Sequence, residues 1–208
     1  LICMAAVAAV LSSCGSKGFR TDELGVKVSA EENREYSYTD KKAGYWYGTT
    51  HQEDLQWYSG WNMAKKRILA DYTIRLEGKD LDRKEAECIV YPDRLVRKWD
   101  NAVETFRMLD NLPIIHIGLE TDAEDTSIGL DQTLLEQDSH MDEQFIFFIP
   151  KEAPDMRIMI GSDNNNGFVL TYGTEEECRG LYAEFIKDGD KMIIDRKDRI
   201  NSLITEYN

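Results

Sequence analysis

The densest group of side chains that could bind a ligand lies in residues 44–62 (GYWYGTTHQEDLQWYSGWN). This segment holds three of the chain's four tryptophans, together with tyrosines, two carboxylates and several amides. Aromatic rings stack on the apolar faces of sugar rings, while carboxylates and amides hydrogen-bond to the sugar hydroxyls. We therefore expect the segment to contact a carbohydrate. The expected contacts are Trp46, Glu53, Asp54, Trp57 and Trp61.

The same aromatic residues have a second interpretation, in which they fill the open end of a folded domain. Their indole N–H groups would then donate hydrogen bonds to the backbone. We expect the tryptophans to divide between the two roles. Trp57 is predicted to be structural because it sits between Leu55 and Tyr58, whereas Trp46 or Trp61 is predicted to be exposed because glycines lie close to both.

The sequence assigns no catalytic residue. Glu53 and Asp54 are adjacent, so on a strand they would point to opposite faces. A glycosidase needs two carboxylates about 5–10 Å apart. With 39 acidic residues in the chain, spacing alone cannot select such a pair.

The remaining polar motifs indicate no metal site and no cofactor. His51, His116 and His140 are not at metal-ligand spacing, and His116 lies among isoleucines, which predicts a core or strand-face residue. Residues 161–167 (GSDNNNG) lack the glutamate that ends a calcium loop, so they predict a hairpin turn. Cys88 and Cys178 are compatible with a disulfide or with two buried thiols.

The charge of the chain restricts its partners. Lys and Arg number 25 and Asp and Glu number 39, so the formal net charge is −14. This excess disfavours nucleic acid, which requires clustered basic residues, and it disfavours direct docking on anionic lipid. Neutral ligands such as sugars remain open.

The first residues resemble the end of a bacterial lipoprotein signal peptide. Residues 1–11 form an uncharged apolar run that is too short to span a bilayer, and Leu11-Ser12-Ser13-Cys14 resembles a lipobox. This resemblance implies a lipid on Cys14, a partial signal peptide over residues 1–13 and a polar tether over 14–34. It places the protein in the bacterial cell envelope, on the outer membrane, with the lipid as its only membrane contact. The alternative is a cysteine that ends an ordinary signal peptide or lies in a buried N-terminal helix.

The elements that would position these residues are mainly strands. Residues 68–76 alternate apolar and polar side chains, which predicts a half-buried antiparallel strand. Residues 120–143 are predicted to form a long loop, and residues 145–149 (FIFFI) a central strand. Short turns and the absence of a βαβ rhythm predict an antiparallel β-sandwich over residues 35–195. The other predicted strands are 86–91, 95–99, 103–109, 113–119, 156–160 and 168–172.

Two helical segments follow the strands. Thr174 and Glu177 have the spacing of a capping box before a short amphipathic stretch that reaches Ile186. Residues 196–208 carry apolar side chains at helical spacing and predict a C-terminal linker helix.

Residues 48–97 are similar to a known family. The similar features are Gln52-Glu53-Asp54 with Trp57 and Gly60, residues 67–78 (RILADYTIRLEG), and Tyr91-Pro92 followed by Leu95-Val96-Arg97. Together they resemble the N-terminal β-sandwich, of supersandwich type, of bacterial glycogen-debranching-type (amylo-α-1,6-glucosidase-like) glycoside hydrolases.

In that family an (α/α)6 barrel follows the sandwich and carries the catalytic carboxylates. The resemblance therefore implies that this chain is a non-catalytic fragment of an α-glucan-directed enzyme, with no catalytic residue of its own. It also implies an α-glucan-like oligosaccharide as ligand, and the barrel, which this sequence does not contain, as a partner. The alternatives are a stand-alone lipid-anchored carbohydrate-binding module and a structural lipoprotein without a ligand.

Overall fold

The fold is seen in a computed structural model of the chain. The structure describes residues 20–28, 37–40, 45–48, 60–63, 66–109, 112–142 and 144–206. For residues 28, 37–40, 45–48 and 206 it describes the backbone alone.

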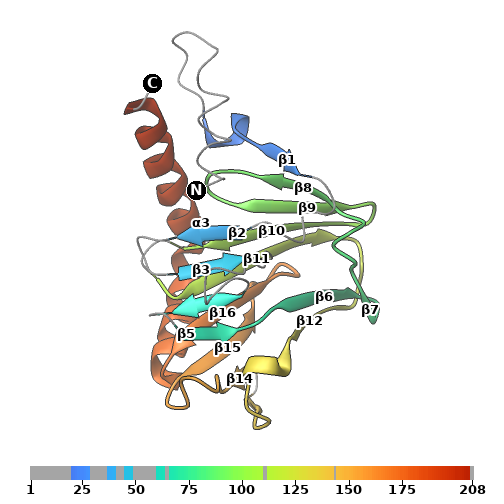
Figure 1. Cartoon of the computed structure of the whole chain (residues 1–208), viewed down its shortest axis with the longest axis vertical. Coiled ribbons are helices and arrows are strands. Elements are labelled where there is room, and N and C mark those ends of the chain that lie inside the picture. The colour runs from blue at the N-terminus through green and yellow to red at the C-terminus, as the bar shows by residue number, and fades with distance from the viewer. Residues whose placement is uncertain are drawn as a thin grey trace, which may run out of the picture.

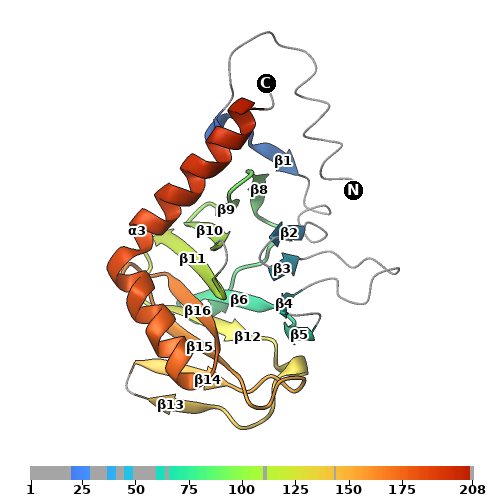
Figure 2. The ribbon, with the colours of Figure 1, turned by 90° about the vertical axis from the view of Figure 1, so that its left-hand side faces the viewer.

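An antiparallel sheet of nine strands forms the body of the molecule, in the order β1-β8-β9-β10-β11-β16-β15-β14-β13 (Figures 1 and 2). Within this sheet, neighbouring strands are consecutive in the chain except at two junctions, β1 with β8 and β11 with β16. The strands are β1 (Val26–Val28), β8 (Glu87–Val90), β9 (Leu95–Trp99), β10 (Ala102–Met108), β11 (Ile114–Thr121), β13 (His140–Asp142), β14 (Phe145–Phe148), β15 (Arg157–Ser162) and β16 (Phe168–Gly173).

Two smaller antiparallel sheets pack on one face of the large sheet. One has the order β12-β6-β7 and the other β2-β3-β4-β5. A single apolar core joins the layers, because buried residues of β5 and β6 lie in the same cluster as buried residues of β10, β11 and β16. The predicted mainly β, antiparallel sandwich is therefore confirmed. The strands are β2 (Ser37–Asp40), β3 (Tyr45–Gly48), β4 (Trp61–Met63), β5 (Lys66–Leu69), β6 (Tyr72–Leu76), β7 (Lys79–Asp80) and β12 (Thr126–Leu130).

The alternating segment 68–76 buries one face as predicted, but it is not one strand. Ile68 belongs to β5 and Tyr72 to β6, and the chain changes sheet between them at Ala70-Asp71. The Asp71 carboxylate accepts a hydrogen bond from the backbone N–H of Tyr72 (2.7 Å) and ion pairs with Arg83. The alternation predicts the buried face correctly because Ile68, Tyr72 and Leu76 are all in the core.

The predicted loop 120–143 is wrong in part. It contains β12, the 3-10 helix η2 (Gln132–Leu134) and β13. Every residue of β12 is half-buried, so this strand shows no alternation, and it forms by pairing with β6, which is distant in sequence. The prediction of a central strand at 145–149 is also wrong: β14 is next to the sheet edge, and Ile146 is partly exposed.

One helix replaces the two that the sequence predicts. Helix α3 (Glu175–Glu206) is continuous and covers the face of the large sheet opposite the small sheets (Figure 2). Residues 187–195 are rich in charge, but Met192 and Ile193 pack with Phe185 against the sheet. These tertiary contacts stabilise the helix through the charged segment. The capping box is confirmed, since Thr174 N donates to Glu177 Oε2 (2.7 Å) and Glu177 N donates to Thr174 Oγ1 (3.3 Å). Among the described residues, no helix is long and apolar enough to cross a membrane.

The start of the described chain is fastened to the end of α3. The 3-10 helix η1 (Thr21–Glu23) precedes β1, and Thr21 N donates to Asn201 Oδ1 (2.8 Å). Asp22 forms ion pairs with Lys197 (2.6 Å) and Arg94 (2.8 Å). Residues 20–28, which the sequence assigns to a tether, thus contact the body of the domain.

Two glycines occupy positions where a side chain would not fit the backbone. Gly60 has a φ of +102°, and a Cβ there would lie 2.0 Å from the carbonyl oxygen of Leu69. Glu77 and Gly78 both have positive φ (50° and 75°), as in the type I′ turn that connects β6 and β7. This hairpin forms one side of the site described next.

Candidate functional site

Of the six residues predicted at sites, the structure describes the side chain of one. Cys14, Glu53, Asp54 and Trp57 lie outside the described residues. The backbone of Trp46 lies in β3, opposite Asn62 of β4. The predicted sugar-binding segment is therefore described only at its two ends.

Trp61 is a core residue. Its side chain is 1% exposed, and its ring meets Tyr172 of β16 edge-on, with the ring centres 6.1 Å apart. The indole thus packs between the small sheets and the large sheet. The burial of Trp61 agrees with the packing interpretation, and the alternative that Trp61 is an exposed wall of a sugar site does not hold. The predicted hydrogen bond from its indole N–H to the backbone is absent, because the buried Trp61 Nε1 has no hydrogen-bond partner among the described residues.

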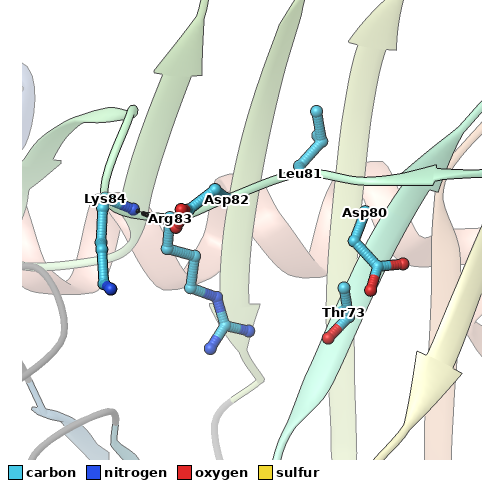
Figure 3. Close-up of a pocket in the computed structure, with 6 residues that line it drawn as sticks. All are labelled: Thr73, Asp80, Leu81, Asp82, Arg83 and Lys84. Carbon is cyan, nitrogen blue, oxygen red and sulfur yellow. Dashed lines mark hydrogen bonds between the residues drawn. The ribbon is translucent and has the colours of Figure 1, made fainter.

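A groove lies at the end of the sandwich where the β6–β7 hairpin meets the ends of β8 and β9. It encloses about 680 Å³, and the half-buried ring of Trp99 lines it together with Asn101 and Lys98. We call this hollow the Trp99 groove. A second hollow of about 380 Å³ shares Asp80 and Asp82 with it (Figure 3). The carboxylates that line the groove are Glu77, Asp80, Asp82, Glu85, Glu87 and Asp100.

Trp99 is held in place by the loop that links β7 to β8. Its indole N–H donates to the backbone oxygen of Asp82 (2.8 Å), which satisfies the polar atom of the ring. A bonded indole N–H restricts rotation of the ring, so the aromatic surface is presented to the groove in one orientation.

Arg83 fixes this loop to the small sheet. Its Nη1 donates to both carboxylate oxygens of Asp71 (2.8 Å each), and its Nη2 donates to the backbone oxygen of Tyr72 (2.6 Å). The guanidinium also lies over the ring of Tyr72, 4.8 Å from its centre. Figure 3 shows the Arg83 side chain extending away from the loop backbone. Arg83 therefore positions Asp82, and Asp82 positions Trp99.

Behind this loop is a buried polar network. The Tyr72 hydroxyl donates to Glu104, and Arg97 Nη1 donates to Glu104 Oε2 (3.0 Å). Burial, and then the neighbouring Glu104 carboxylate, raise the pKa of Tyr72. Burial alone would lower the pKa of Arg97, but the charge of Glu104, together with Tyr72 and Cys88, raises this pKa overall. All three side chains are closed to solvent, so the network supports the fold and does not form a reaction site.

The groove carboxylates are partly neutralised. Arg75 pairs with Asp80 (2.6 Å) and Lys27 pairs with Glu87 (2.8 Å). The hydrogen bond from Lys27 lowers the pKa of Glu87. Glu77 accepts hydrogen bonds from the backbone N–H groups of Glu124 and Asp125 (3.0 and 3.3 Å). The groove thus offers several hydrogen-bond acceptors beside an aromatic surface.

His116 is a buried residue of β11, as predicted, but the sequence did not reveal its partner. His116 Nε2 lies 2.9 Å from Asp163 Oδ2, and the ring packs 5.0 Å from that of Phe185 in α3. Asp163 belongs to the connection between β15 and β16, which confirms the predicted hairpin turn. The two residues are far apart in the chain, so only the fold brings them together. The pair lies beneath α3 and has a structural role.

The two cysteines are free and lie in different clusters. Cys88 is in the sandwich core, while Cys178, in the first turn of α3, packs against Phe147 and Met159 of the large sheet. The sequence left open a disulfide or two buried thiols, and the structure shows two buried thiols. Burial raises the pKa of Cys88 to about 11, so this thiol is protonated at neutral pH. Within the described part of the chain, no group of three or more His, Cys, Asp or Glu side chains could hold a metal ion.

Comparisons of the chain with protein-family models, with curated proteins and with solved structures found no match. The resemblance to glycogen-debranching-type enzymes therefore stays a prediction, and the case for a function depends on the Trp99 groove.

Proposed function

We propose that this domain binds a carbohydrate in the Trp99 groove. The observation that carries this proposal is a fixed, half-buried indole in a groove lined by carboxylates, an amide and lysines. This combination suits a sugar because the ring takes the apolar face and the polar groups take the hydroxyls. The acidic lining disfavours phosphorylated ligands.

The proposal includes the family role that the sequence suggests. The domain would be the non-catalytic sandwich of an α-glucan-directed glycoside hydrolase lipoprotein, and an (α/α)6 barrel would supply the catalytic carboxylates. The proposed sugar contacts still include Trp46, Glu53, Asp54 and Trp57. Trp99 replaces Trp61 among them. A stand-alone carbohydrate-binding module would use the same groove without a barrel.

Sugar binding is tested by titration with maltoheptaose, followed through the indole N–H resonances of the four tryptophans. We expect the Trp99 resonance to move and Trp99→Ala to abolish binding, while Trp99→Phe retains part of it because a smaller ring still stacks. The matched control is Trp61→Phe, which changes the core and leaves the groove intact. A shift confined to the other indoles, or unchanged affinity in Trp99→Ala, would contradict the proposed site.

The non-catalytic role makes a separate prediction. Incubation of the purified domain with maltose, isomaltose, trehalose or limit dextrin should release no glucose above the blank. Turnover that co-purifies with the domain would show that it carries its own catalytic carboxylates.

Lipid attachment is proposed for Cys14, with the protein in the bacterial cell envelope. When the gene is expressed with its full signal, Cys14→Ala should move the protein from the membrane fraction to the soluble fraction. Cys178→Ala is the control, because that thiol is buried in the fold. Membrane retention of Cys14→Ala would contradict the lipobox.

A further inference from the structure

The edge of the large sheet at β13 exposes a row of apolar side chains that starts in the core. Leu170 pairs with Ile160, Ile160 with Ile146, and Ile146 with Met141, so the four residues lie side by side on neighbouring strands. Their exposed fractions rise outward, from 0% at Leu170 and 5% at Ile160 to 37% at Ile146 and 77% at Met141. The small sheets therefore cover Leu170 and Ile160 but leave Ile146 and Met141 exposed.

The outer side of β13 has no partner strand within the described residues. β13 is the last strand in the order of the sheet, and Figure 2 shows it at the lower end of the molecule. An open edge presents unpaired backbone N–H and C=O groups, which can accept a further strand.

The strand is rigidly supported from its other face. The His140 ring stacks on Phe147 with the ring centres 4.7 Å apart, and Arg179 of α3 lies over Phe147 at 4.9 Å. Arg179 also forms ion pairs with Asp142 and Glu175. Because β13 is already held in strand geometry, a partner strand would find it preorganised.

The charges around this edge select the kind of partner. Glu136 and Asp138 are exposed just before β13, and Glu143 follows it in the sequence, whereas Asp142 is paired with Arg179. A second copy of this chain would bring the same carboxylates against each other, and each copy has a net charge of −14. Acidic residues at a sheet edge oppose such self-pairing. A strand with basic residues would instead be attracted to them.

We propose that β13 binds an extended segment of a partner protein in which apolar and basic residues alternate. The segment would add a tenth strand to the sheet, with an apolar side chain beside Met141 and with basic side chains near Glu136 and Asp138. This proposal is independent of the carbohydrate proposal, because the β13 edge and the Trp99 groove share no residues.

The test uses the whole chain and a fluorescent heptapeptide that alternates Lys and Val. We expect it to bind the parent protein, to slow amide exchange at residues 140–142, and to bind Met141→Lys about tenfold more weakly or worse. The matched control is Ile194→Lys on α3, because Ile194 is also an exposed apolar residue but is far from the edge. Melting curves establish that both variants are folded.

Three further probes separate the possible outcomes. A peptide with the same side chains but N-methylated backbone should bind about tenfold more weakly, since it cannot form the strand hydrogen bonds. A heptapeptide alternating Glu and Val should not bind. Equal binding of the N-methylated peptide would show attraction by charge alone and would overturn the proposal. If the parent protein sediments as a dimer and Met141→Lys sediments as a monomer, β13 pairs with β13 of a second copy. That result would also overturn the proposal.

Discussion

Glu104 is the residue on which the buried polar network depends. It accepts hydrogen bonds from both Tyr72 and Arg97 inside the core. Glu104→Ala removes the carboxylate that neutralises Arg97, and we expect a loss of about 3–5 kcal/mol in the free energy of unfolding. Urea denaturation would measure this loss. The control is Lys27→Ala, which breaks the exposed ion pair with Glu87 and should change the free energy of unfolding little. An equally small effect of Glu104→Ala would contradict the role given to the network.

Asp163 gives a prediction about pH. Burial alone would raise its pKa, but the hydrogen bonds from His116 and from the backbone N–H groups of Asn165 and Gly167 lower the pKa below its usual value. A carboxyl with a lowered pKa in the folded state stabilises the fold above its unfolded pKa, about 3.9, and this contribution is lost as the pH falls through the folded value.

Asp163→Asn should therefore destabilise the domain by about 1–3 kcal/mol at pH 7. The difference from the parent should shrink when the pH falls below about 4. Chemical unfolding at several pH values would test this, with the exposed Asp155→Asn as control. A difference that stays constant down to acidic pH would show that the Asp163 charge does not matter.

The candidate site shows why single residues were hard to predict. Residues 44–62 are where side chains that could bind a ligand lie closest together along the chain. Trp99 has no such neighbourhood, since its groove is assembled from the β6–β7 hairpin, the loop at Arg83 and the end of β9. The contact between Trp99 and Asp82 could be predicted only if the strand pairing were already known.

At the scale of elements, α3 begins where its capping box predicts. Thr174→Ala removes the side-chain acceptor for the N–H of Glu177 and should cost about 1 kcal/mol. Thermal unfolding would measure it, and Glu176→Ala in the same turn is the control. If both variants melted alike, the cap would contribute nothing beyond the helix itself.

The strands were predicted best where one face is buried. The alternation in β6 follows its burial, because one face of the strand is in the core; β10 also buries alternate residues, but one of them is the charged Glu104. β12 could not be found in this way, since all its residues are half-buried and its pairing with β6 is not local. The continuity of α3 was missed for a similar reason, because Met192 and Ile193 stabilise the middle of the helix only through contacts with the sheet.

At the scale of the whole molecule, η1 connects the start of the described chain to α3. The hydrogen bond from Lys197 contributes most to the lowered pKa of Asp22. Lys197→Ala should therefore loosen residues 20–28 and speed their amide exchange, while exchange in β10 and β11 stays slow. Hydrogen-exchange mass spectrometry would measure this, with Lys191→Ala as control. If amide exchange at residues 20–28 did not change, the pairing of β1 with β8 would be sufficient to hold this segment without the Asp22–Lys197 ion pair.

The two non-consecutive junctions of the large sheet have a consequence for how the chain acquires its fold. β8 to β11 form one run of neighbouring hairpins and β13 to β16 form another, and among the described strands of this sheet the pairing of β11 with β16 joins them. A chain that emerges N-terminus first completes β11 long before β16 exists. During that interval the segment Ile114–Ile117 has an open edge and a strongly apolar sequence, which is the combination that promotes aggregation. Long-range pairing of this kind is also slow. Joining the two halves is thus the step at which a chaperone would matter most.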